Sequence, residues 1–251
     1  QFIKKLCDRH LGVGSDGLII AQDSDNQSDL TMDIYNSDGT QAEMCGNGIR
    51  CLIKYIIDKN LFPRLKSFKI NTLSGIIVSE YTQKNLIRVN MGKPYLNPED
   101  IPTYATVGVH SLPEGSIELN GYLYQFTAVG MGNPHMVIIV KSLNDINIEI
   151  LGPKLEKSDF FPAQTNVHFV EIVNPNMIKM KVWERGSGIT KACGTGACAV
   201  LVACKMQGLC DNYSKILLPG GELSIDWPKK DSSVFMEGPA NHVFNGSYPR
   251  N

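Results

Sequence analysis

Met-Cys-Gly-Asn-Gly at residues 44–48 and Ala-Cys-Gly-Thr-Gly at residues 192–196 are two copies of one cysteine-glycine motif. Their cysteines, Cys45 and Cys193, stand 148 residues apart (193 − 45). The match extends upstream, to a Tyr-Asn pair in the first half and a Trp-Glu pair in the second, at the same distance from the cysteine. This duplication predicts two similar halves, each with one thiol at the start of a helix.

Hydrophobic periodicity around the two motifs predicts a fold that mixes helices and strands. Helices are expected at residues 2–10 and directly after each cysteine. Strands are expected at residues 18–21, 30–35, 68–71, 75–81, 86–91, 119–129, 135–140, 167–173, 178–183, 222–227 and 234–238.

The helix after Cys193 is small and apolar on nearly all sides, with Ala197, Ala199 and the run 200–203. A helix with so few polar positions is expected to be covered by a strongly curved sheet. We therefore expect an α/β fold of the α+β type. Two pseudo-symmetric halves would each wrap a curved mixed or antiparallel sheet around a central helix, one built from residues 1–92 with the tail 238–251, the other from residues 93–237.

Composition excludes several classes of function. The 251 residues carry a formal net charge of −1 and no sustained basic run, so nothing favours nucleic acid or a membrane surface as partner. No apolar run reaches the roughly 18 residues that cross a bilayer. A small-molecule substrate is expected instead.

Cysteine usage indicates a reducing compartment, and we expect the cytoplasm. The seven cysteines are odd in number and dispersed, unlike a secreted disulfide framework. No Cys-x-x-Cys pair is present, so a structural zinc site is not expected. Apart from the two motif cysteines, those in or just after the helical patterns are expected in the core: Cys51, Cys198, Cys204 and Cys210.

A cysteine at a helix start has a specific chemistry. The first N–H groups of a helix lack intrahelical partners and the helix dipole is positive there, so a carboxylate or a developing oxyanion binds well. The same field is expected to lower the pKa of a neighbouring thiol. Two helix starts, each with a thiol, suit inversion of a stereocentre, because the carbon must be approached from two opposite faces. The alternative is that Cys45 and Cys193 merely fill space, as free cysteines often do.

Gly-Val-Gly-Ser-Asp-Gly at residues 12–17 matches the pattern of dinucleotide-binding loops. That pattern requires a strand, the loop and then a helix, whereas here an expected helix precedes the loop and an expected strand follows. A nucleotide site is therefore not expected.

Other polar residues are weaker candidates. His135 ends the turn Met-Gly-Asn-Pro-His at residues 131–135 and could orient a thiol. Arg185 could pair with a carboxylate and Glu184 with an ammonium or a thiol, unless the two form an ordinary solvated pair. Asn166 alone resembles any loop asparagine.

With these motifs together, the chain resembles the diaminopimelate epimerases, cofactor-independent isomerases of lysine and peptidoglycan precursor synthesis. The proline racemases share the fold and the paired cysteines but typically carry histidine where Asn47 stands, so Asn47 and the Glu184-Arg185 pair favour the epimerases. The resemblance is carried by Tyr-Asn-Ser-Asp-Gly at 35–39, both cysteine motifs, Met-Gly-Asn-Pro-His at 131–135, Trp-Glu-Arg-Gly at 183–186 and Leu-Pro-Gly-Gly at 218–221.

The resemblance implies a diaminopimelate epimerase-like fold, catalytic roles for Cys45 and Cys193, and modulation of the thiols by His135 and Glu184. It implies neither cofactor nor metal. Gly17 stands where some members have a substrate-binding glutamine, and a family motif Gly-Asn-Asp-Phe is absent. Implied substrate contacts are Asn36, Gly46, Asn47, Asn133, Asn166, Glu184, Arg185, Gly194 and Thr195.

The expected activity is interconversion of LL- and meso-diaminopimelate, one cysteine taking the Cα proton as thiolate while the other supplies a proton to the opposite face as thiol. Three alternatives stay open. They are a proline or hydroxyproline racemase-type isomerase, a cysteine hydrolase or acyltransferase with Cys193 as nucleophile and His135 or His168 as base, and a non-catalytic binding protein. A homodimer is an open expectation.

The repeat also makes an expectation about residues before Gln1. A counterpart of Asn133 would stand 148 residues earlier, at position −15 (133 − 148). We expect the chain as it stands to be weakly active or inactive, because a loop that forms one wall of the site would be missing. We also expect it to be aggregation-prone, because an open sheet edge and apolar surface would lie beside the Cys45 helix. An upstream extension is expected to restore solubility and turnover.

Overall fold

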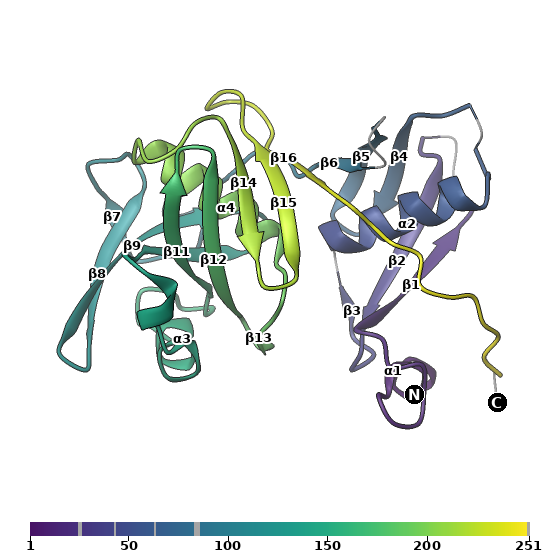
Figure 1. Cartoon of the computed structure of the whole chain (residues 1–251), viewed down its shortest axis with the longest axis horizontal. Helices are drawn as coiled ribbons and strands as arrows, with labels where there is room; N and C mark the ends of the chain where they lie inside the picture. Colours follow the sequence, from purple (N-terminus) through teal and green to yellow (C-terminus); the bar gives the residue numbers. More distant parts are fainter. Residues whose placement is uncertain (25–26, 43, 63, 83–85, 250–251) are drawn as a thin grey trace. The chain divides into compact units, whose positions relative to one another are not determined.

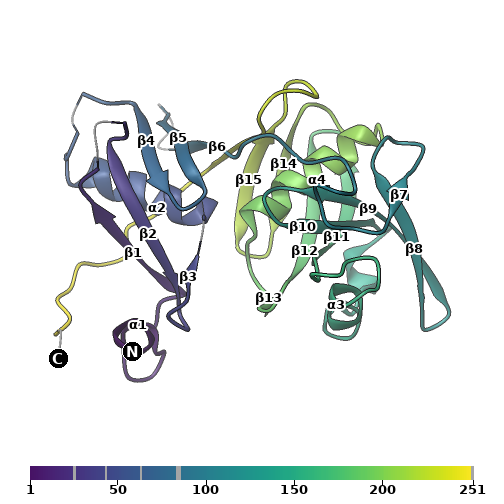
Figure 2. The same ribbon diagram turned by 180° about the vertical axis from the view of Figure 1, so that it is seen from behind.

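The computed structural model describes residues 1–24, 27–42, 44–62, 64–82 and 86–249. The chain divides into two compact units, one formed by Gln1–Asn90 with Glu237–Asn251 and the other by Met91–Met236. Each unit has its own helix packed against its own strands (Figures 1 and 2).

The first unit is a mixed sheet with strand order β1-β2-β4-β5-β6. The β2 and β4 strands are parallel, the other neighbours are antiparallel, and β3 pairs with β2. Its elements are α1 (Phe2–Cys7), β1 (Gly17–Gln22), β2 (Leu30–Asn36), β3 (Gln41–Ala42), α2 (Gly46–Asp58), β4 (Ser67–Thr72), β5 (Gly75–Tyr81) and β6 (Ile87–Asn90).

Helix α1 is shorter than the sequence pattern predicts and ends at Cys7. Asp8 leaves the helical conformation, with φ −59° and ψ 129°. Its carboxylate accepts hydrogen bonds from the N–H groups of His10 and Leu11, at 2.8 and 2.7 Å. This local pairing competes with continuation of the helix.

Helix α2 packs one face against β1, β5 and β6, and no strand of the described chain covers its other face, which the C-terminal segment 240–245 crosses (Figure 1). Ile49, Ile53 and Ile56 are buried, whereas Cys51 and Tyr55 are exposed. One expectation is therefore wrong. Cys51 is not a core residue, because the apolar residues of α2 repeat on only one face of the helix.

The second unit has the strand order β15-β14-β12-β11-β10-β9-β8-β7. The β10–β11 and β12–β14 pairs are parallel and the others antiparallel. Its elements are β7 (Thr106–Val107), β8 (Pro113–Leu119), β9 (Tyr122–Gly130), β10 (Pro134–Ile139), η1 (Leu143–Asp145), α3 (Ile148–Glu156), β11 (Asn166–Asn174), β12 (Met177–Glu184), β13 (Gly188–Ile189), α4 (Gly194–Met206), β14 (Tyr213–Leu218) and β15 (Gly221–Asp226). Strand β16 (Phe235–Gly238) carries the chain back to the first unit.

Helix α4 is covered on nearly all sides, as its sequence predicts. Every residue from Gly196 to Cys204 is buried. The helix packs against five strands of one sheet, β9, β10, β11, β14 and β15, so the sheet curves around it (Figure 2). Each fully buried Val or Leu contributes about 1.5–3 kcal/mol. Cys198 and Cys204 are buried as expected, and Cys210 is half-buried.

The expected strand at 119–129 corresponds to β9 and begins three residues too early. The residues before β9 include Asn120 and Gly121, whose φ angles are 54° and 79°. Positive φ at both central residues is the geometry of the tight hairpin turn that Asn-Gly favours. Strands β8 and β9 therefore pair antiparallel on either side of it. Helix α3 and strands β3, β7, β8, β13 and β14 were not expected from the sequence.

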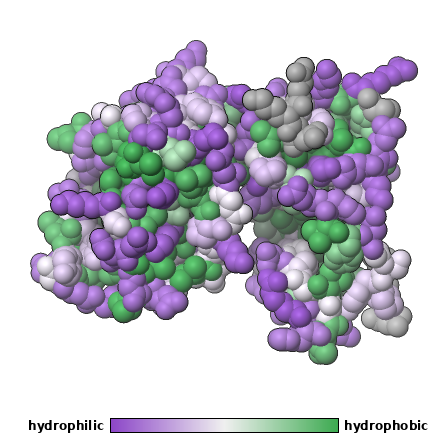
Figure 3. Space-filling view, in the orientation of Figure 1, coloured by the Kyte–Doolittle hydropathy of each residue, from purple (hydrophilic) through white to green (hydrophobic). Residues whose placement is uncertain are grey.

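No helix in the described part of the chain is long and apolar enough to cross a membrane. The face seen in Figure 3 mixes hydrophobic and hydrophilic residues over both units.

Candidate active site

Cys45 caps the N-terminus of α2. Its backbone is extended, with φ −145° and ψ 112°, and its Sγ accepts a hydrogen bond from the N–H of Gly48 at 3.4 Å. The side chain is half-buried. Gly48 has little room for a side chain, because an added Cβ would lie 3.0 Å from Cδ1 of Ile34. The predicted placement of this thiol at a helix start is confirmed.

Two asparagines of the first unit differ in how they are paired. Asn36 ends β2, is exposed, and donates from Nδ2 to Oγ1 of Thr40 at 3.0 Å. Asn47 follows Gly46 in the first turn of α2, and its buried Oδ1 finds no partner within the described ranges. A buried acceptor without a partner is costly in a free protein, so it is suited to a ligand donor.

Gly17, where some diaminopimelate epimerases carry glutamine, stands opposite Asn36 in the β1–β2 pair. An added Cβ at Gly17 would lie 2.4 Å from the carbonyl oxygen of Tyr35. A longer residue therefore requires a shift of the backbone at this position.

Cys193 caps the N-terminus of α4 with the same extended backbone, φ −139° and ψ 107°. Its Sγ lies 3.7 Å from Oγ1 of Thr195, and the residue is 5% exposed. Burial raises the pKa of this thiol to about 12, the negative charge of Glu184 adds to the rise, and the Thr195 hydroxyl opposes it. The expectation that the helix start lowers this pKa is wrong for Cys193, because desolvation of the thiolate dominates.

His135 lies at the centre of a buried polar chain. Its Nδ1 is 2.8 Å from Nε2 of His168, and its Nε2 is 2.8 Å from Oδ1 of Asn133. Both imidazoles are fully buried, and burial lowers the pKa of each, that of His168 to about 3. Both rings are therefore neutral near pH 7.

The Glu184-Arg185 pair lies at the end of β12 and is not simply solvated. Oε1 of Glu184 accepts a hydrogen bond from the Thr190 hydroxyl. Arg185 donates from a guanidinium N–H to the carbonyl of Ala163 at 3.1 Å. Both side chains are thus held by contacts within their own unit.

Asn166 is more than a loop asparagine. It is buried, donates from Nδ2 to the carbonyl of Pro134 at 2.9 Å, and accepts the N–H of Arg185 at Oδ1, at 3.1 Å. One side chain therefore joins the start of β10 to the end of β12. The predicted contact of Asn166 with substrate stays a prediction.

Sequence reasoning missed Glu156. This buried carboxylate accepts the indole N–H of Trp183 at 2.7 Å and the backbone N–H of Gly186 at 2.8 Å. It fixes the turn that follows Glu184-Arg185. The only sequence signal was an acidic residue in a stretch not recognised as the end of helix α3.

The second unit thus collects Cys193, Gly194, Thr195, Glu184 and the His135–His168 pair around the start of α4. The first unit collects Cys45, Gly46 and Asn47 around the start of α2. Among the residues that the structure describes, no cluster of His, Cys, Asp and Glu could hold a metal ion.

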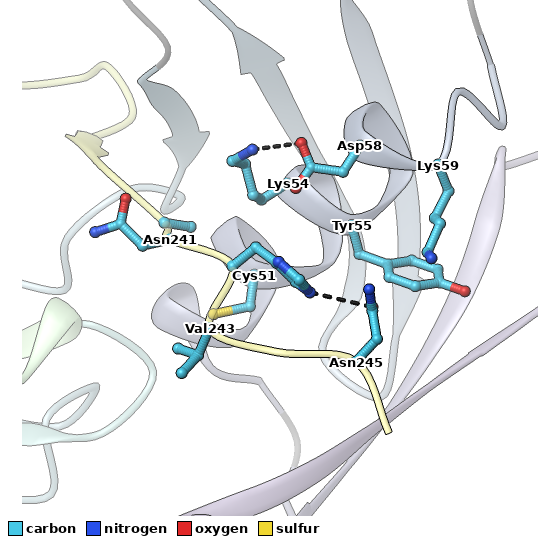
Figure 4. Close-up of a pocket in the computed structure, with 10 residues that line it drawn as sticks. Cys51, Lys54, Tyr55, Asp58, Lys59, Asn241, Val243 and Asn245 are labelled. Atoms are coloured by element: carbon cyan, nitrogen blue, oxygen red, sulfur yellow. Dashed lines mark hydrogen bonds and ion pairs between the residues drawn. The ribbon is translucent and has the colours of Figure 1, made fainter. Parts of the chain in front are cut away.

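A cavity of about 450 Å³ lies beside α2, from its middle to its C-terminal end, under the C-terminal segment 240–245 (Figure 4). Cys51, Lys54, Tyr55 and Asp58 line its helix side, with an ion pair between Lys54 and Asp58. Neither Cys45 nor any other predicted site residue lines this cavity, so it is separate from the group formed by Cys45, Gly46 and Asn47.

The chain matches the sequence profile of the family described as Diaminopimelate epimerase over residues 1–97 and 127–243. A diaminopimelate epimerase of Prochlorococcus marinus (strain MIT 9313) is 49% identical over 98% of this chain and 81% of its own length. One from Carboxydothermus hydrogenoformans is 47% identical over 98% of this chain and 87% of its own length.

Solved structures with low sequence identity share the fold. A hydroxyproline epimerase from Agrobacterium vitis superposes with a TM-score of 0.66 at 12% identity, over 95% of this chain and 77% of that one. A phenazine biosynthesis protein of the PhzF family from Bacillus anthracis gives 0.62 at 15% identity, over 90% and 82%. At such identities the likeness concerns the fold alone, and it agrees with the expected fold class.

Proposed function

The chain belongs to the diaminopimelate epimerase family, and on that premise we propose that it interconverts LL- and meso-diaminopimelate by proton transfer between the thiols of Cys45 and Cys193. The observation that carries the proposal is the common position of the two cysteines. Each caps its helix with the same extended backbone, so each thiol lies beside N–H groups that can bind an anionic group.

The two thiols take opposite roles in a given direction. One cysteine, as the thiolate, removes the proton from one face of Cα, while the other, as the thiol, supplies a proton to the opposite face. Reversal of the reaction exchanges the two roles, because each turnover leaves the proton on the other sulfur.

The Cα–H of an amino acid is a very weak acid, so the negative charge that develops must be stabilised without an electron-accepting cofactor. Backbone N–H groups at the starts of α2 and α4 are the proposed donors. Loss of one oxyanion-type donor typically costs about 3–4 kcal/mol, so a few such donors lower the barrier greatly. We propose that no cofactor or metal takes part.

The remaining predicted residues complete the proposal. Glu184 modulates the Cys193 thiol through its charge. For His135, whose hydrogen bonds go to His168 and Asn133, the proposed route runs through His168, which lies against Gly196 in the first turn of α4. Asn47 offers an unpaired buried acceptor to the substrate. The proposed substrate contacts are Asn36, Gly46, Asn47, Asn133, Asn166, Glu184, Arg185, Gly194 and Thr195.

Solvent isotope exchange tests the proposal directly. The protein is incubated with LL-diaminopimelate in D₂O, and deuterium at Cα and the appearance of the meso isomer are followed by NMR. We expect deuterium in the product without cleavage of any carbon–carbon or amide bond. Racemisation of proline without reaction of diaminopimelate, or hydrolysis of an ester, would refute the proposal.

The cysteine hydrolase alternative is disfavoured by the histidines. A nucleophilic cysteine requires a base that accepts its proton. His135 is hydrogen-bonded to both His168 and Asn133, and burial lowers the pKa of His168 to about 3, which makes it a weak base.

The free thiols of the described chain support a reducing compartment, and we propose the cytoplasm.

A further inference from the structure

His168 lies on the α4 side of the sheet. Its neighbours in β11, Val167 and Phe169, belong to the core cluster that includes Leu151 and Leu155 of α3. Successive side chains of a strand point to opposite faces, so His168 points away from that cluster. His135 lies on the same side, since its neighbour Met136 also belongs to the α3 cluster.

The first turn of α4 packs directly on the His168 ring. A Cβ added at Gly196 would lie 2.3 Å from Cε1 and 3.0 Å from Nε2 of His168, and 3.0 Å from Sγ of Cys193. Gly196 is therefore a glycine because the imidazole occupies the space of a side chain. His168 is 0% exposed.

The hydrogen-bond chain through His168 has a defined polarity. Oδ1 of Asn133 can only accept, so Nε2 of His135 carries a hydrogen. Because neutral imidazole has one N–H, Nδ1 of His135 accepts and Nε2 of His168 donates. Nδ1 of His168 is then a bare acceptor, which agrees with its lack of a partner in the described chain.

The opposite direction of donation, from Asn133 to His135 to His168, would satisfy the buried polar atoms less well. It would turn the Asn133 amide so that its NH₂ group donates to His135, and it would leave a buried N–H at Nδ1 of His168 with no acceptor. Buried N–H groups without partners are rarer in proteins than under-satisfied acceptors. The chain therefore runs from His168 to His135 to Asn133, and it leaves the Asn133 NH₂ group free to donate elsewhere.

We propose that His168 is a positioning residue for the epimerase reaction, which through His135 holds the Asn133 amide with its NH₂ group directed to the substrate. The proposal rests on the proposed contact between Asn133 and substrate. Burial lowers the pKa of both imidazoles, so the chain stays neutral and keeps its polarity near pH 7.

Two substitutions of His168 separate the effect of its N–H donor from the effect of its bulk. Gln at position 168 keeps an N–H donor that can reach Nδ1 of His135, whereas Leu has similar bulk and no donor. The parent chain has only five histidines, so the ring signals of His135 can be followed in a ¹⁵N-histidine NMR spectrum. We expect a single Nε2–H tautomer of His135 in the parent and in H168Q. In H168L we expect a mixture of tautomers. A pure Nε2–H tautomer in H168L would overturn the proposal.

Kinetics give the second readout. An amide that binds substrate and transition state alike affects KM, so H168L should raise KM about tenfold with little change in kcat, and H168Q should stay close to the parent. A purely structural role beside Cys193 would instead lower kcat. If H168L folds poorly, H168Q against the parent still tests whether the donor suffices, and loss of activity in H168Q would count against the proposal.

A double-mutant cycle distinguishes the positioning role of His168 from the contact between Asn133 and substrate on which it rests. If His168 acts through Asn133, H168L should have little further effect on KM in an N133A background. Equal effects of H168L in both backgrounds would overturn the positioning role. An N133A variant with the parent KM would refute the Asn133 contact itself, while the tautomer of His135 would still show whether His168 sets the polarity of the chain.

Discussion

Cys45 and Cys193 hold the same position in their helices, yet their sulfur atoms have different surroundings. The Cys45 thiol is half-buried and accepts the N–H of Gly48. The Cys193 thiol is buried near Glu184, and its pKa is raised to about 12. Equivalent helix ends therefore do not make equivalent thiols, because desolvation depends on what covers each sulfur.

Replacement of either motif cysteine by serine should abolish epimerisation. A serine hydroxyl is far too weak an acid to serve as a base near pH 7. C45S and C193S are each expected to keep no more than about one per cent of activity, with unchanged circular dichroism. C51S is the matched control, since Cys51 is exposed on the same helix as the Cys45 cap and should retain activity. Substantial turnover by either serine variant would disprove the two-thiol mechanism.

Cys193 should make the protein less stable in alkali. Its folded pKa, raised to about 12, exceeds the ordinary value near 9, so between these values the native state keeps a proton that the unfolded chain has lost. The free energy of unfolding then falls as pH rises, by at most about 1.4 kcal/mol per pH unit. From about pH 8 to about pH 10, C193A should lose roughly 1 kcal/mol less stability than the parent in urea unfolding. Identical pH dependence in both proteins would contradict this.

At the scale of elements, each cysteine-glycine motif fits its helix start differently. In α4 the second glycine of the motif, Gly196, lies against His168 and Cys193. In α2 the equivalent Gly48 lies against the ends of the Ile34 and Ile19 side chains, at 3.0 and 3.3 Å from an added Cβ. The rigid ring cannot retreat, whereas an isoleucine methyl group can move by a few tenths of an ångström.

Alanine at the two glycines should therefore have unequal effects. G196A is expected to cost about 1–3 kcal/mol of stability and to reduce kcat, because the new methyl group displaces His168 or the Cys193 thiol. G48A should change stability by less than about 1 kcal/mol, since better helix propensity offsets the contact with Ile34. Thermal unfolding and steady-state kinetics of both variants check this. Equal losses at the two positions would show that the His168 contact is unimportant.

At the scale of the whole molecule, two units each present one thiol at the start of a helix, and the described residues contain no metal-binding cluster. We expect a colourless enzyme whose activity survives dialysis against EDTA and is lost on treatment with iodoacetamide. Protection from iodoacetamide by substrate is the control for action at the site. Activity restored by an added metal, or an imine absorbance from bound pyridoxal phosphate, would contradict the cofactor-independent mechanism.

Several features followed from the sequence alone, because they depend on residues close together in the chain. The motif repeat predicted both helix starts, and the apolar surface of residues 196–204 predicted the burial of α4. The family followed from short motifs at the same points. The Asn120-Gly121 turn was also a local signal, and overlooking it left β8, the strand before the turn, unpredicted.

Other features depended on contacts between residues far apart in the chain, and the tertiary structure alone decided them. The raised pKa of Cys193 requires the burial that the curved sheet provides. The polarity of the Asn133 amide requires His168, which lies more than 30 residues away in the next strand. Cys51 is exposed because the strands of its unit cover only the opposite face of α2. Desolvation and hydrogen-bond pairing are set by neighbours in space, which local sequence patterns do not specify.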